Sequence, residues 1–68
     1  MIEANLTVDK SESKYIESLV SAEFQIIRDQ TVGSGYPDNR LYKYYHLRIS
    51  EEEYTLLSLK FGDNIWLR

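Results

Sequence analysis

Three consecutive glutamates, Glu51 to Glu53, are the residues of this chain whose types and spacing come nearest to a reactive or metal-binding group. Carboxylates can hold a cation, act as an acid and base, or offer negative charge to a cationic partner. Successive residues of a helix point about 100° apart, so three glutamates in a row cannot converge on one ion. We interpret them as favourable charges at a helix start and as an anionic patch that a cationic groove could recognise.

Catalytic residue types are sparse elsewhere. His46 is the only histidine, and the chain has no cysteine. No serine stands in the Gly-x-Ser-x-Gly context of a nucleophile elbow. Gly33-Ser34-Gly35 lacks the lysine that follows in a phosphate-binding loop and is typical of a flexible hairpin tip. We therefore predict a protein that is not an enzyme and that has no metal site and no cofactor.

The tyrosine-rich run from Leu41 to Ile49 is the second candidate feature, and its strand-like alternation predicts two different faces. One face carries Leu41, Lys43, Tyr45, Leu47 and Ile49, and the other carries Tyr42, Tyr44, His46 and Arg48. The first set is expected to pack beneath a helix. The second set forms an aromatic strip that an N-terminal helix, a twin subunit or a foreign partner must cover, since tyrosine and arginine are enriched at interfaces.

Six elements are expected to position these residues. They are a strand over residues 2–8, a helix over 10–20, strands over 24–29 and 41–49, a helix over 51–61 and a closing strand over 64–68, with the longest loop at 31–39. The second helix has the clearest signals, because Ser50 and Glu53 form a capping box and Gly62 stands where a helix ends. Asp9 and Glu12 offer a similar box for the first helix.

This order predicts an α+β fold in which a small antiparallel sheet carries both helices on one face, in the ferredoxin-like manner. A ββαβ unit with residues 1–20 as an appendage fits the same pattern. The 68 residues are enough for one domain, with residues 1–68 sharing a single core. A core of this size supplies only a few kcal/mol and no disulfide can supplement it, so help from homodimerisation is expected.

Composition narrows the class of protein further. Hydrophobic residues make up 43% of the chain, which argues for a folded protein. The first residues lack the basic start and apolar run of a signal peptide, and no stretch is long enough to span a membrane, so we expect a cytoplasmic protein. The net charge of −3 argues mildly against electrostatic binding of nucleic acid.

The run YKYYHLRISEEEY, residues 42–54, resembles the tyrosine-rich strand and following helix of the small uracil-DNA glycosylase inhibitors of Bacillus phages. The interval of eight residues from His46 to Tyr54 matches the family's spacing from histidine to helix aromatic. A short closing strand, Ile65 to Leu67, matches as well, and the resemblance covers about residues 24–68. The family's glutamate within the strand is replaced here by Tyr44.

The resemblance implies a homodimeric, non-catalytic DNA mimic that blocks the DNA-binding groove of a host uracil-DNA glycosylase. Such an inhibitor offers carboxylates where phosphates would sit and an apolar pocket for the wedge that the enzyme inserts into DNA. The implied partner-binding residues are Tyr54, Leu57 and Tyr44 for the pocket or dimer surface, and Glu51, Glu52 and Glu53 as phosphate substitutes.

Another interpretation is a small nucleic-acid-binding module, in which tyrosines on an open sheet face stack on bases. Four basic residues support it by lying on the central hairpin, namely Arg28, Arg40, Lys43 and Arg48. An interaction protein with an unrelated target is a third possibility, and a small enzyme is the fourth.

Overall fold

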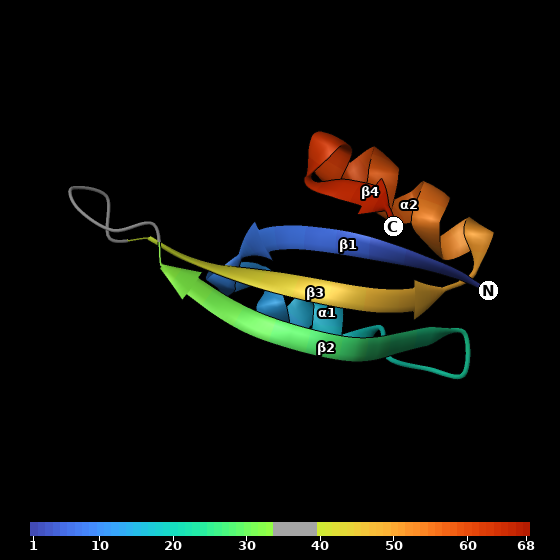
Figure 1. Cartoon of the computed structure of the whole chain (residues 1–68), viewed down its shortest axis with the longest axis horizontal. Coiled ribbons are helices and arrows are strands. Elements are labelled where there is room, and N and C mark those ends of the chain that lie inside the picture. Colours follow the sequence, from blue (N-terminus) through green and yellow to red (C-terminus); the bar gives the residue numbers. More distant parts are fainter. Residues whose placement is uncertain (34–39) are drawn as a thin grey trace.

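A computed structural model describes residues 1–33 and 40–68 of the chain. The elements are the strands β1 (Ile2–Asp9), β2 (Phe24–Gly33), β3 (Leu41–Ile49) and β4 (Ile65–Leu67), the helices α1 (Ser13–Ser18) and α2 (Glu51–Phe61), and the 3₁₀ turns η1 (Lys10–Glu12) and η2 (Gly62–Asn64). The strands form one antiparallel sheet in the order β2-β3-β1-β4 (Figure 1).

The sheet places β1 and β3 at its centre, with β2 and β4 at its edges. Strand β1 pairs with β3 along its whole length, from Ile2 opposite Ile49 to Asp9 opposite Tyr42. The N-terminal strand is therefore the middle of the sheet and not an appendage to a ββαβ unit. The α+β fold with the β-α-β-β-α-β order is confirmed.

Both helices pack on the same face of this sheet. Their buried residues Ile16 and Leu57 belong to one core cluster that is lined by alternate residues of the strands. The strands contribute Ala4, Leu6 and Val8 from β1, Phe24 from β2, Tyr45, Leu47 and Ile49 from β3, and Ile65 from β4. The two helices also touch, since the rings of Tyr15 and Phe61 have centroids 6.5 Å apart. The core-facing set expected on β3 is buried from Tyr45 onward, whereas Leu41 is exposed.

Helix α2 begins and ends where its capping residues require. The Ser50 hydroxyl accepts a hydrogen bond from the Glu53 backbone N–H at 3.2 Å, which satisfies one of the free donors of the first turn. Gly62 takes a φ of 57°, a left-handed conformation that residues with a Cβ rarely adopt, and so ends the helix. Both predicted boundaries are confirmed.

The structure differs from the sequence-based expectation in the first helix and in the hairpin. Residues 10–20 do not form one continuous helix, because the Asp9 carboxylate accepts from the Ser11 N–H at 3.1 Å and starts a tight 3₁₀ turn before α1. The expected loop over residues 31–39 was too long, since β2 continues to Gly33 and pairs with Leu41 there. Residues 34–39 lie outside the described part.

An irregularity in β2 also changes which of its residues face the helices. Ile26 is opposite Leu47 and Arg28 is opposite His46, so Ile27 is an extra residue at a β-bulge. As a result Phe24 and Ile26 face the helices, whereas Arg28, Gln30 and Val32 share the face of their partners on the other side of the sheet.

Candidate functional site

The face of the sheet that points away from both helices is the main candidate site, and we call it the open face. Within the described ranges no helix covers it, because α1 and α2 both contribute to the core on the opposite side. Strand register and alternation assign its members. They are Glu3, Asn5 and Thr7 of β1, Gln25, Arg28, Gln30 and Val32 of β2, Tyr42, Tyr44, His46 and Arg48 of β3, and Trp66 of β4, with Arg68 beyond it.

An aromatic pair lies at the middle of the open face. The rings of Tyr44 on β3 and Trp66 on β4 have centroids 6.5 Å apart and planes inclined by 56°. The two strands flank β1, so the pair meets above that central strand. Tyr44 is half-buried, whereas 43% of Trp66 is exposed. The face therefore presents ring surface to solvent, as a stacking platform requires.

A three-residue chain of hydrogen bonds lies beside this pair. His46 Nδ1 is 2.6 Å from Arg68 Nη1, and His46 Nε2 is 2.6 Å from Glu3 Oε1. A guanidinium can only donate, so Nδ1 accepts and the ring proton of a neutral His46 sits on Nε2, which donates to Glu3. This hydrogen bond, with the nearby positive groups of Arg48 and Arg68, lowers the pKa of the Glu3 carboxyl below 4.5. Both ring nitrogens of His46 are therefore hydrogen-bonded, which holds the ring in place.

Asn5 lies beneath the aromatic pair and the histidine. It is opposite His46 on one neighbouring strand and opposite Trp66 on the other, and only 9% of it is exposed. Its Oδ1 has no hydrogen-bond partner within the part of the chain that the structure describes. Buried side-chain oxygens are usually bonded, so this acceptor needs an explanation.

The charges of the chain are unevenly distributed over its surface. Among the residues that the structure describes, the open face carries the three arginines Arg28, Arg48 and Arg68 but only one acid, Glu3, although the whole chain has a net charge of −3. The face is therefore the cationic side of an acidic protein. Anionic partners are favoured there, and cationic partners are favoured elsewhere.

A second candidate, which we call the acidic corner, lies at the start of α2. Glu51 and Glu52 are exposed and line two shallow hollows, one with Thr55 and Leu56 and one with Met1, Ile2, Glu23 and Ser50. The Ser50 backbone N–H donates to the Glu23 carbonyl at 3.2 Å, which brings a third glutamate to this corner. Glu23 belongs to no sequence motif, so its position at this corner could not be predicted from the sequence.

The residues expected to form an apolar pocket are not brought together. Leu57 is 2% exposed and fills the core, and Tyr54 is half-buried against the same core. Tyr44 lies on the open face, so the thickness of the sheet separates it from both. Alternation on β3 is the cause, since even-numbered residues of that strand point away from the helices. Glu53 is half-buried beside its more exposed neighbours Glu51 and Glu52.

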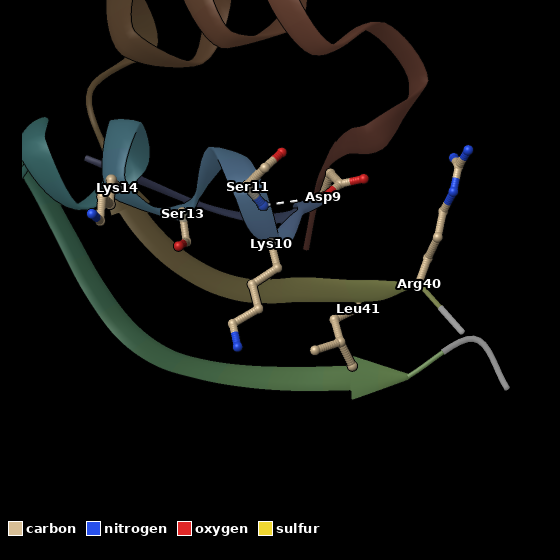
Figure 2. A pocket seen from close by; sticks show the side chains of 7 residues that line it. All are labelled: Asp9, Lys10, Ser11, Ser13, Lys14, Arg40 and Leu41. Atoms are coloured by element: carbon tan, nitrogen blue, oxygen red, sulfur yellow. Dashed lines mark hydrogen bonds between the residues drawn. The ribbon is translucent and has the colours of Figure 1, made fainter. Parts of the chain in front are cut away.

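The basic residues expected on the hairpin also divide between faces. Arg28 and Arg48 lie on the open face, whereas Lys43 points to the helix side and pairs with Asp29 at 3.7 Å. Arg40 lines a hollow near η1 together with Lys10, Lys14 and neighbouring residues (Figure 2). The side chains of Lys10 and Arg40 extend in different directions there, so the hollow has no converging basic cluster (Figure 2).

Within residues 1–33 and 40–68 no cluster of histidine and carboxylate side chains could hold a metal ion. In the same residues no helix is long and apolar enough to cross a membrane. No family model matches the chain, and no curated protein or solved structure is similar to it.

Proposed function

We propose that this protein binds single-stranded nucleic acid on the open face. The observation that carries the proposal is the Tyr44–Trp66 pair, which lies beside three arginines on a sheet face that neither α1 nor α2 covers. Every base has a flat aromatic surface, so such a pair accepts bases with little regard to sequence, and each stack contributes about 1–3 kcal/mol. Arginines at the rim supply contacts to the phosphates.

The charge of the open face determines how strongly this binding depends on salt concentration. Phosphate contacts from all three arginines would give a plot of the logarithm of the binding constant against the logarithm of salt concentration a slope of about −2, and this is the steepest slope expected because His46 holds Arg68. The negative charge on the rest of the molecule opposes long-range attraction. Binding is therefore expected to depend on stacking more than on electrostatics.

The test is a titration of a fluorescently labelled oligonucleotide with purified protein, followed by anisotropy, with DNA and RNA strands of one sequence as separate arms. Tyr44→Ala and Trp66→Ala are each expected to weaken binding at least fivefold, because each removes one stacking surface. Tyr15→Ala is the matched control, since Tyr15 is an exposed aromatic on the helix side. If no single strand binds, or if all three variants lose affinity equally, the proposal fails.

The acidic corner supports a second candidate function. We propose, as the alternative, a DNA mimic that occupies the cationic groove of a host uracil-DNA glycosylase in the cytoplasm, acting as a homodimer. The supporting observation is that Glu51 and Glu52 line one hollow with Leu56, whose side chain is 61% exposed, and a second hollow with Glu23. Carboxylates beside an apolar contact are what a groove that binds phosphates and inserts an apolar wedge would accept.

Excision of uracil from DNA by a glycosylase, measured with and without the protein, tests this alternative. Inhibition at equal concentrations is expected, and it should weaken in the double variant Glu51→Gln, Glu52→Gln but not in the control Glu12→Gln, Glu17→Gln. Unchanged excision at a stoichiometric excess would remove the candidate. Light scattering that shows a mass near the 8.1 kDa of one chain would remove the homodimer.

A further inference from the structure

The unpaired oxygen beneath the aromatic pair points to a more specific ligand. Resting on the nucleic-acid function proposed above, we propose that the open face seats one base between Tyr44 and Trp66. Asn5 Oδ1 then accepts a hydrogen bond from an N–H group of that base. The ligand class is thus a single strand whose bases present a hydrogen-bond donor at their edge, as adenine, cytosine and guanine do with their amino groups.

The position and burial of Asn5 suit a hydrogen-bond acceptor that a ligand could satisfy. It is more than nine-tenths buried, it lies on the central strand, and its register places it below His46 and Trp66. Its Oδ1 finds no donor within the described residues. His46 cannot supply one, because its ring proton is directed to Glu3. A ligand N–H would satisfy an acceptor that the fold leaves unpaired.

Access to Asn5 depends on Trp66. This side chain sits on a strand of three residues at the edge of the sheet, and 43% of it is exposed, so its ring can turn without disturbing the core. A base held between two rings needs about 7 Å, twice the roughly 3.4 Å spacing of stacked bases. In the structure the two rings instead contact each other directly, with centroids 6.5 Å apart and planes inclined by 56°. The Trp66 ring must therefore move outward and turn parallel to the Tyr44 ring to open the slot and uncover Oδ1.

The surrounding charges fit a nucleic-acid strand that places a base in the slot and keeps its phosphates outside. Arg48 and Arg28 lie on the same face and can reach the phosphates of the flanking nucleotides. Arg68 is held by His46 and by its own backbone N–H, which donates to the Glu3 carbonyl at 3.2 Å. The slot is therefore bordered by the hydrogen-bonded Arg68 and His46 on the β4 side and by the exposed side chains of Arg28 and Arg48 toward β2 and the end of β3.

Two single-stranded octamers test the inference, one of adenine deoxynucleotides and one whose bases are unsubstituted purine, which lacks only the amino group. Both have the same backbone charge and a similar stacking surface. The adenine octamer is expected to bind roughly fivefold to tenfold more tightly, which is the effect of one hydrogen bond to a buried acceptor. Asn5→Ala should abolish this difference, whereas Asn64→Ala, the same change at an exposed asparagine, should preserve it.

A side-chain amide spectrum of the wild-type protein provides a second measurement that needs no variant to fold. The Asn5 amide resonance is expected to shift on titration with the adenine octamer and to move much less with the purine octamer. Equal affinity for both octamers, or a preference that persists in a folded Asn5→Ala protein, overturns the inference but leaves the proposed function intact. Absence of binding to either octamer overturns both.

Discussion

His46 Nε2 lies 2.6 Å from Glu3 Oε1, and this hydrogen bond runs diagonally across the two central strands of the sheet. Glu3 is directly opposite Arg48, and His46 is directly opposite Asn5, so the bond joins neighbours on one face that are offset by one pair. Diagonal neighbours of this kind are within reach of long side chains. The bond fixes the histidine ring over Asn5 and links the charge of Glu3 to stability.

The first prediction concerns the acid side of the pH profile. The pKa of Glu3 is lowered in the folded protein, first by the hydrogen bond from His46, so the unfolded chain binds this proton more readily. The stabilisation is therefore present above the ordinary pKa of 4.5 and is lost as the pH falls through the folded-state value. Thermal unfolding should show a higher melting temperature for wild type than for Glu3→Gln at pH 7, and a smaller difference at pH 3. A constant difference across this range would contradict the assignment.

The second prediction is that Tyr45→Phe leaves stability unchanged or raises it by up to about 1 kcal/mol. Tyr45 is fully buried, and its hydroxyl has no hydrogen-bond partner among residues 1–33 and 40–68. Removing an unpaired buried hydroxyl removes a desolvation cost while the ring keeps its packing. Urea unfolding measures the change, with Leu47→Ala as the contrasting core variant that should lose about 2–5 kcal/mol. A large loss in Tyr45→Phe would reveal a partner for the hydroxyl.

The third prediction concerns alkaline pH. Burial, with the negative charges of Glu17 and Asp29, raises the pKa of Tyr45 above 10.0 in the folded state. Above pH 10 the unfolded chain loses this proton more readily than the folded chain, so stability falls as the pH rises toward the folded-state value. The difference in unfolding free energy between wild type and Tyr45→Phe should therefore grow from pH 9 to pH 11, in favour of the variant. A difference independent of pH would refute it.

The fourth prediction concerns the cap of α2. Ser50→Ala removes the acceptor for the Glu53 N–H and is expected to cost about 1 kcal/mol. Ser58→Ala makes the same chemical change inside the same helix, where alanine is the better helix former, and should stay within about 0.5 kcal/mol of wild type. Chemical denaturation of both variants measures the contrast. Equal effects would mean that the serine hydroxyl contributes nothing as a cap.

The sequence was most informative where local chemistry decides the structure. Strand β3 and helix α2 have the predicted bounds, because alternation, the Ser50 cap and Gly62 act through neighbouring residues. The first helix was predicted too long, since the Asp9 carboxylate competes with regular helix formation over the next residues. The extent of β2 was predicted too short, since pairing with β3 outweighs the turn preferences of Thr31 to Gly33.

The candidate site was harder to predict because it depends on contacts between distant segments. Alternation placed Tyr44 on the outward face correctly, but nothing in the sequence indicated that Trp66 would lie beside it or that Asn5 would lie below. That arrangement arises from the strand order, which inserts β1 between β3 and β4. Leu57 was expected at a binding surface, yet the helical period that exposes Leu56 and Leu59 turns Leu57 into the core.

The bulge at Ile27 determines which changes of length β2 can tolerate. Deleting Ile27 would restore a regular ladder and leave every later residue on its present face, with Arg28 still opposite His46. Deleting Gln30 instead would turn Thr31 outward and Val32 toward the helices, and would exchange the faces of the rest of the strand. The variant without Ile27 should therefore fold with Arg28 still on the open face. The variant without Gln30 should instead have a mispaired end of the β2–β3 hairpin.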